Sequence, residues 1–125
     1  MQHALIIEDR EVIALMIQDE LAELGFASAA IASSQYEAIQ LAERRYPDLI
    51  TVDDGLSSGS GIEAVRHICR HQAIPVVFIT GDAKTVTDAV AEAIILEKPF
   101  THAALAEAVR LATEGARTYS YVHVL

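Results

Sequence analysis

The sequence predicts an α/β protein in which a doubly wound sheet of five parallel strands is covered by five helices. Short apolar runs, typical of strands, alternate with segments in which apolar residues recur every three or four positions, typical of amphipathic helices. Such alternation implies parallel strands joined by right-handed crossovers, with helices on both faces of the sheet. The 125 residues are enough for one domain with a single core.

Five segments are expected to be strands. Four are almost wholly apolar and do not alternate with polar residues, as expected of strands that are covered on both faces. The other, over residues 26–32, is rich in alanine and gives the weakest strand signal. Pro75 fits the start of the fourth strand, where its missing N–H is tolerated. The expected strands cover residues 4–7, 26–32, 48–53, 76–79 and 94–96.

A helix is expected after each strand. The first has apolar residues at helical spacing and ends at Gly25, a residue common just after helices. Ser33 or Ser34 can cap the second helix, which ends before Pro47, and Thr101 is the expected cap of the last. The apolar stripes of the five helices lie within residues 12–24, 38–42, 62–69, 86–90 and 105–112.

Composition argues against several classes of protein. The formal net charge of −9 disfavours a nucleic-acid partner, because phosphates reward clustered Lys and Arg. No apolar stretch approaches the ~20 residues that a bilayer-spanning helix needs. We find no signal peptide, and the single cysteine, Cys69, excludes an intramolecular disulfide. We therefore expect a cytoplasmic protein that does not contact a membrane.

Polar residues stand where four of the expected strands end. Glu8 and Asp9 follow the first strand, Asp53 ends the third, Thr80 ends the fourth and Lys98 follows the fifth. If the strands are parallel, these ends share one edge of the sheet, which is where open α/β sheets bind ligands. Carboxylates, a hydroxyl and an ammonium at one place suit a divalent metal beside a phosphoryl group.

The expected acids have the chemistry that Mg²⁺ requires. Mg²⁺ prefers hard oxygen ligands in octahedral geometry and usually keeps several waters. Asp9, Asp53 and a carbonyl from the following loop would supply ligands, with Glu8 acting directly or through water. Three crowded acids without a cation would raise at least one pKa, so the cluster makes electrostatic sense mainly with a metal present.

Taken in order, these segments resemble the receiver domain of bacterial two-component response regulators. The resemblance covers roughly residues 3–116, so we expect a receiver domain over residues 1–117. It implies a flavodoxin-like fold with strand order 2-1-3-4-5. The segments that carry it are Leu-Ile-Ile-Glu-Asp at 5–9, Pro-Asp-Leu-Ile-Thr-Val-Asp at 47–53, the loop over 56–61, Val-Phe-Ile-Thr-Gly at 77–81 and Lys-Pro-Phe at 98–100.

The resemblance assigns a role to each acid of the expected site. It implies that Asp53 is the phosphoacceptor, and that Glu8 and Asp9 are the acidic pair that holds Mg²⁺ with Asp53. It also implies that Gly55 lends its backbone carbonyl to the metal. Asp54 directly follows the acceptor, and because neighbouring side chains of a strand point to opposite faces, only one of the two should face the pocket.

The remaining roles concern the phosphoryl group and the switch. The resemblance implies that Thr80 hydrogen-bonds one phosphoryl oxygen and that Lys98 pairs with another. The family often has a cis peptide bond before the proline that follows this lysine, which makes Pro99 a candidate. Ile95 departs from the pattern, because receivers commonly place an aromatic switch residue three positions before the lysine.

The same resemblance implies the partners. A histidine kinase or a histidine phosphotransfer protein would donate the phosphoryl group, and the protein's own chemistry would be limited to self-phosphorylation and slow self-dephosphorylation at Asp53. Unless the chain was cut from a longer protein, these 125 residues leave no room for a second domain, and we expect output through protein–protein binding with a downstream target, phosphate relay or a phosphate sink. The apolar tail over residues 118–125 could be a free end, a sheet-edge contact or a dimer contact.

Two other functions stay open. The chain could be a receiver-like interaction module that is never phosphorylated, because Ile95 replaces the aromatic switch residue common in receivers. A phosphatase of the haloacid-dehalogenase type would also phosphorylate an aspartate beside Mg²⁺, but it requires a second acid where this chain has Gly55. A nucleotide-binding flavodoxin-like role is disfavoured, because Glu8-Asp9-Arg10 replaces the glycine-rich turn that would hold phosphate.

Overall fold

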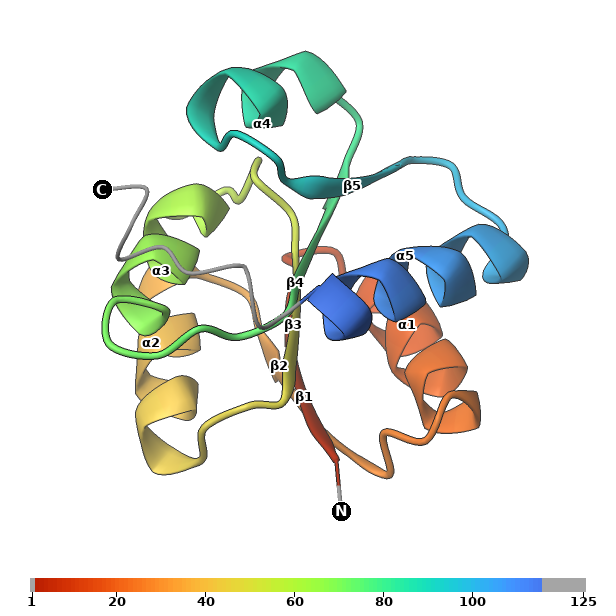
Figure 1. Cartoon of the computed structure of the whole chain (residues 1–125). Coiled ribbons are helices and arrows are strands. Elements are labelled where there is room, and N and C mark those ends of the chain that lie inside the picture. Colours follow the sequence, from red (N-terminus) through yellow and green to blue (C-terminus); the bar gives the residue numbers. More distant parts are fainter. Residues whose placement is uncertain (1, 116–125) are drawn as a thin grey trace.

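Five parallel strands form one sheet in the order β2-β1-β3-β4-β5 in the computed structural model, which describes residues 2–115 (Figure 1). This order and the five helices confirm the predicted doubly wound, flavodoxin-like fold. The strands are β1 (His3–Ile7), β2 (Ser28–Ala32), β3 (Leu49–Val52), β4 (Val76–Thr80) and β5 (Ile94–Glu97).

The three inner strands are buried along their whole length, and this explains their continuous apolar sequence. Ile6 of β1 lies between Ile31 of β2 and Thr51 of β3 in the parallel register. β2 and β5 are the edge strands, and most of their residues are only half-buried. The weak strand signal over residues 26–32 is thus explained by the position of β2 at the edge of the sheet. The strand itself begins at Ser28, two residues later than predicted.

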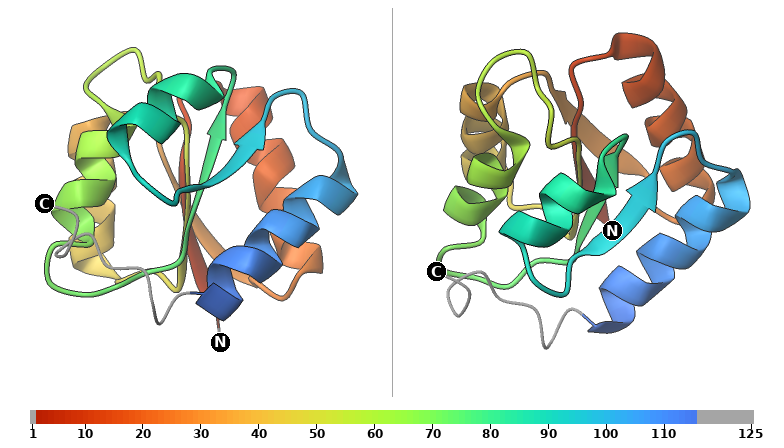
Figure 2. Two further views of the ribbon diagram at one scale, coloured as in Figure 1. Left: turned by 45° about the horizontal axis from the view of Figure 1, so that its top comes forward. Right: turned by 90° about the horizontal axis from the view of Figure 1, so that it is seen from above.

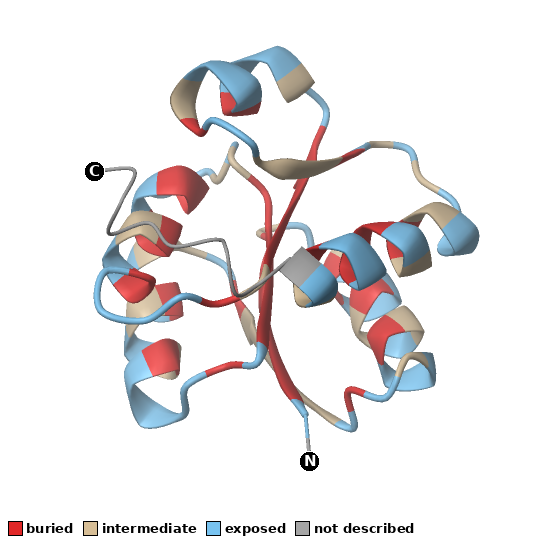
Figure 3. Cartoon of the chain, viewed as in Figure 1, coloured by how far each residue is buried: buried red, intermediate tan, exposed pale blue. Residues whose placement is uncertain are grey.

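The five helices cover the sheet on both faces (Figures 1 and 2). α1 and α5 pack on one face, while α2, α3 and the seven-residue α4 pack on the other. Figure 3 shows the buried residues along the strands and on the sheet-facing sides of the helices. The helices are α1 (Glu11–Glu23), α2 (Gln35–Arg44), α3 (Gly61–Ile68), α4 (Ala83–Ala89) and α5 (His102–Gly115).

Side-chain caps fix where α2, α3 and α5 begin. The Ser34 hydroxyl accepts from the backbone N–H of Glu37 at 3.1 Å, and the Glu37 carboxylate accepts from Ser33 N at 2.7 Å. This reciprocal pair assigns to Ser34 the cap that the sequence left open between two serines. Thr101 accepts from Ala104 N at 3.1 Å, and Ser60 caps α3 through Glu63 N at 3.2 Å. Each cap satisfies an N–H that has no partner within its helix.

Two expectations lie outside the described residues. The boundary of the domain at residue 117 and the apolar tail over residues 118–125 both fall after Gly115. Within residues 2–115, no helix has the length and apolar character needed to cross a lipid bilayer.

Gly61, the first residue of α3, lies against the backbone that carries Asp53. A β-carbon at Gly61 would overlap the Asp53 carbonyl oxygen and come within 2.7 Å of Val52 Cγ2. Only a glycine permits this approach without moving either segment. The helix therefore holds the end of β3, and with it the position of Asp53.

We predict that Gly61→Ala lowers the free energy of unfolding by about 2 kcal/mol, because backbone atoms cannot yield to the added methyl group. Gly81→Ala is the matched control, since a β-carbon there meets nothing within 4 Å. Its free energy of unfolding should change by less than about 1 kcal/mol. Urea unfolding followed by circular dichroism measures both, and equal effects of the two substitutions would contradict the argument.

Candidate functional site

An open pocket of about 410 Å³ lies at the carboxyl edge of the sheet. Its walls come from the segments that directly follow β1, β3 and β5 and from the last residue of β4 and its loop. The predicted convergence of strand ends is therefore present. The pocket is lined by Asp9, Arg10, Asp53, Asp54, Gly55, Thr80, Gly81, Asp82 and Lys98.

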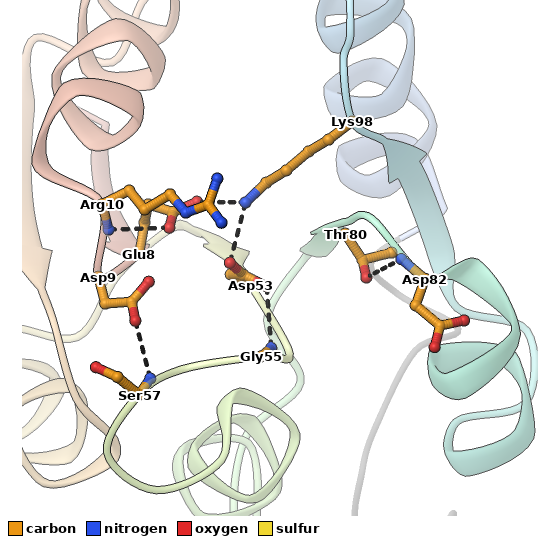
Figure 4. Close-up of polar contacts among 9 residues, drawn as sticks. All are labelled: Glu8, Asp9, Arg10, Asp53, Gly55, Ser57, Thr80, Asp82 and Lys98. Atoms are coloured by element: carbon orange, nitrogen blue, oxygen red, sulfur yellow. Dashed lines mark hydrogen bonds and ion pairs between the residues drawn. The ribbon is translucent and has the colours of Figure 1, made fainter.

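The Lys98 ammonium joins two acids from different strands (Figure 4). Its Nζ lies 2.9 Å from Glu8 Oε1 and 3.0 Å from Asp53 Oδ2. The side chains of Glu8 and Asp53 are only 1% and 12% exposed, and that of Lys98 is 19% exposed. A charge with so little access to water is costly unless it is paired, so this ion-pair cluster is a condition for burying the acids.

Hydrogen bonds hold both the backbone and the carboxylate of Asp53. Asp53 N donates to Ile7 O at 2.9 Å, which continues the β1–β3 pairing one residue past β3. The Gly55 N–H donates to Asp53 Oδ1 at 2.9 Å, while Oδ2 accepts from Lys98. Each carboxylate oxygen of Asp53 thus has its own donor, and the side chain is held at the wall of the pocket.

The charged groups of the site have shifted proton affinities. Burial raises the pKa of the Glu8 carboxyl above its ordinary value, and the hydrogen bond from Lys98 only partly offsets this. Burial disfavours ionisation of Asp9, but hydrogen bonds from Ser57 outweigh it and hold the pKa of Asp9 below its usual range. Burial also disfavours charged Lys98, yet its hydrogen bonds to Glu8 and Asp53 prevail and raise the pKa of the ammonium.

The acidic cluster fits a divalent cation. Glu8, Asp9 and Asp53 each offer an oxygen, and these three atoms lie within 4.8 Å of one another. Ser57 N donates to Asp9 Oδ2 at 2.8 Å, which orients the more accessible acid toward the loop after β3. Carboxylate oxygens in such a group match the hard donors that Mg²⁺ prefers. The Gly55 carbonyl stays a predicted ligand, since its observed contact is through the N–H.

Thr80 connects the pocket to α4. Its hydroxyl oxygen accepts from Asp82 N at 2.9 Å. The Asp82 carboxylate in turn accepts from Thr85 N at 3.3 Å and from Thr85 Oγ1 at 2.6 Å, so it caps α4. No hydrogen bond between the Thr80 hydroxyl and Asp53 or Lys98 is present in the described part of the chain. An aspartate three residues before Thr85 is an N-cap signal that can be read from the sequence.

The structure corrects the expectation for Asp54. Asp53 and Asp54 both line the pocket, although strand alternation allowed only one of them to do so. Alternation does not apply because β3 ends at Val52 and the chain bends at Asp54. Asp54 is half-buried and has no hydrogen bond or ion pair with the described residues, so Asp53 alone makes the specific contacts.

Three further positions complete the site. Ile95, on β5, is half-buried and packs against the core beneath α2, α3 and α4. The peptide bond between Lys98 and Pro99 is cis. Sequence reasoning missed the contribution of Arg10, whose backbone N–H donates to Glu8 Oε2 at 3.1 Å and whose side chain lines the pocket.

This arrangement matches a known family. The family model of the response regulator receiver domain matches residues 4–110, which is most of the chain. The chain belongs to the receiver domains of two-component response regulators. The fold and the acidic pocket described above are therefore those of a receiver module.

The relatives of this receiver domain include longer regulatory proteins. The transcriptional regulatory protein PdtaR of Mycobacterium tuberculosis is 31% identical over 121 residues, which are 93% of this chain and 58% of PdtaR. The receiver domain spans little more than half the length of that relative.

Two solved receivers have the same fold. The receiver domain of PhyR from Erythrobacter litoralis is 28% identical with a TM-score of 0.81, covering 89% of this chain and 88% of that one. The receiver domain of the sensor histidine kinase PA1611 from Pseudomonas aeruginosa is 26% identical with a TM-score of 0.76, covering 90% and 98%. The latter structure is described with a magnesium ion coordinated in its active-site cleft.

We predict that Lys98→Met lowers the free energy of unfolding by about 2 kcal/mol in metal-free buffer, since Glu8 and Asp53 lose their shared cation. Added Mg²⁺ should narrow the gap to the parent, because a divalent cation supplies the missing positive charge. Lys84→Met is the control: it breaks an exposed pair with Asp88 and should have little effect. A Lys98 variant as stable as the parent without metal would refute this reading of the ion-pair cluster.

Proposed function

We propose that this receiver domain is a phosphorylation-dependent switch that accepts a phosphoryl group on Asp53 from a phosphohistidine of a histidine kinase or histidine phosphotransfer protein. One observation carries the proposal: the Asp53 carboxylate is fixed by Lys98 and by the Gly55 N–H at the wall of an open acidic pocket. It is therefore oriented by the protein while it stays reachable from solvent.

Transfer would be a single displacement at phosphorus. A carboxylate oxygen of Asp53 forms a new bond to phosphorus as the bond from phosphorus to the donor imidazole nitrogen breaks. The electron pair of the broken bond stays on that nitrogen, which is then free to take a proton from solvent. A separate, slow step would reset the protein: water attacks phosphorus of the acyl phosphate, the bond from phosphorus to the Asp53 oxygen breaks, and inorganic phosphate leaves. Positioning and charge stabilisation account for most of such catalysis.

Repulsion between anions is the main obstacle to this reaction, and the pocket has two means of reducing it. Asp9 and Asp53, with Glu8 directly or through water and with the Gly55 carbonyl, would hold Mg²⁺. When bound, the ion would screen the phosphoryl oxygens from the attacking carboxylate. Lys98 would pair with another phosphoryl oxygen, and its raised pKa keeps it charged at neutral pH. The magnesium described in the PA1611 receiver supports this assignment.

Output would begin at Thr80. Its hydroxyl has a proton that it can donate to a phosphoryl oxygen, and the same oxygen already accepts from Asp82 at the start of α4. A shift of Thr80 toward Asp53 would therefore act on the cap of α4. Ile95 provides packing but no polar tip at the position where receivers commonly have an aromatic residue, so the Thr80–Asp82 contact is the more direct route.

The partner of the switched surface would be another protein. Binding to a downstream target is the proposed output, with phosphate relay and phosphate-sink behaviour as its other forms. Any enzymatic activity would be confined to self-phosphorylation and self-dephosphorylation at Asp53. A cytoplasmic location and a homodimer formed through residues 118–125 stay predictions.

We predict that acetyl phosphate with Mg²⁺ adds one phosphoryl group to the parent, and that Asp53→Asn abolishes the addition. Asp54→Asn is the matched control, because it removes a neighbouring acid of the same pocket that has no specific contact. Intact-mass spectrometry measures the product. A parent that gains no mass would favour the unphosphorylated interaction module, and a parent that turns over phosphomonoesters would favour the phosphatase.

We predict that Thr80→Val keeps phosphorylation at Asp53 but loses the response of α4. Valine has nearly the same shape and lacks the hydroxyl, whereas Thr80→Ser keeps the hydroxyl and serves as control. Backbone amide NMR spectra recorded with and without beryllofluoride and Mg²⁺ report on α4 residues such as Val86. Equal changes at α4 in the parent and in Thr80→Val would show that the signal does not pass through this hydroxyl.

A further inference from the structure

Arg10 occupies a position in α1 that does not favour it. It is the N-cap residue of the helix, with φ −91° and ψ 108°, and its side chain makes no capping hydrogen bond. N-cap positions favour side chains that accept hydrogen bonds from the first turn. A cation is also unfavourable there, because the helix dipole makes this end positive. Helix stability therefore does not account for an arginine at this position.

The backbone of Arg10 is fixed to the acidic site while its side chain is not. Its N–H donates to Glu8 Oε2 at 3.1 Å, and its carbonyl accepts from Ala14 N at 2.9 Å. Within residues 2–115, its guanidinium has no hydrogen-bond or ion-pair partner. The exposed guanidinium of Arg110, by comparison, contacts both Glu107 and Glu114. Arg10 thus has a backbone that is fixed beside the proposed metal-binding acids and a positively charged side chain that is free to bind a ligand.

The guanidinium is within reach of the phosphoacceptor pocket. Arg10 and Lys98 are the two basic residues among those that line it. In Figure 4 the Arg10 side chain extends from the start of α1 toward the side of the pocket that holds the Lys98 ammonium. Arg10 and Lys98 also line an adjoining apolar hollow that includes Pro99 and Phe100. These two basic residues therefore lie at the boundary between the acidic pocket and the hollow.

The charges of the pocket leave a role for a second basic side chain. The Lys98 ammonium is already shared between Glu8 and Asp53. Transfer replaces the single negative charge of Asp53 by a phosphoryl group of about −2, so the pocket becomes more negative. A guanidinium can donate two parallel hydrogen bonds to two oxygens of such a group, which an ammonium cannot.

We propose that Arg10 is a phosphoryl-binding residue of this site. Its guanidinium donates to phosphoryl oxygens that Lys98 and Thr80 leave unbound, and it lengthens the residence of the group on Asp53. The inference rests on the proposed function of Asp53 and adds to it Arg10, which directly follows the Leu-Ile-Ile-Glu-Asp segment at residues 5–9. An arginine at this position makes α1 less stable, because its positive charge lies at the positive end of the helix dipole.

The test compares affinities for beryllofluoride, a mimic of the phosphoryl group, in Arg10→Gln, Arg10→Lys and Arg44→Gln. Arg44 is exposed at the end of α2 and makes the last variant a control for overall charge. Calorimetric titration at saturating Mg²⁺ should show affinity about tenfold weaker in Arg10→Gln, about the loss of one charge-assisted contact, and an intermediate loss in Arg10→Lys. Arg44→Gln should match the parent.

Two further readouts distinguish phosphoryl binding by Arg10 from a role in metal binding or in folding. Titration with Mg²⁺ alone should show equal or tighter binding in Arg10→Gln, because a competing cation has been removed from an acidic pocket. Thermal unfolding of Arg10→Gln should occur at or above the parent's temperature, since the cation opposes the helix dipole. Unchanged beryllofluoride affinity, or a loss of Mg²⁺ affinity by the same factor, would overturn the proposal. A parent that binds no beryllofluoride at Asp53 would instead overturn the proposed function.

Discussion

The site depends on the ion-pair cluster in which the Lys98 ammonium lies between Glu8 and Asp53. The two acids follow different strands, and both are largely removed from water. Without a cation between them, one would have to be protonated or exposed. The cluster thus joins the ends of β1, β3 and β5 into one pocket, and it orients the Asp53 carboxylate within that pocket.

The rest of the fold places these groups with little freedom. Backbone pairing continues past the strand ends, from Asp53 N to Ile7 O and from Lys98 N to Thr80 O. Gly61 holds α3 against the backbone of Asp53, and the Asp82 cap ties the Thr80 hydroxyl to α4. A change of charge at Asp53 is therefore adjacent to hydrogen bonds that lead to a helix at the surface. This proximity is what a switch requires, because a bound group can shift an equilibrium only through contacts that differ between its two states.

The strands of the sheet and the meeting of their polar ends at one edge could be predicted from the sequence. Continuous apolar runs mark strands that are covered on both faces, and chain order with parallel pairing brings their ends to one edge. The error at Asp54 arose because β3 stops one residue earlier than expected, so strand alternation does not extend to that acid. The strand at β2 was predicted correctly, and its signal was weak because it is an edge strand. The role proposed for Arg10 could not be predicted, because an exposed residue contributes nothing to the apolar periodicity of a helix. It follows only from two structural facts, that Arg10 is the N-cap residue of α1 and that it lines the pocket.

The most direct test is a crystal structure of the protein with Mg²⁺ and beryllofluoride. The account predicts beryllium bonded to an Asp53 oxygen, Mg²⁺ ligated by Asp9 and Asp53, and the Lys98 ammonium within hydrogen-bonding distance of a fluorine. Beryllofluoride absent from Asp53 while Mg²⁺ occupies the acidic cluster would contradict it. So would a Lys98 ammonium that remains on Glu8 alone and makes no contact with the bound group.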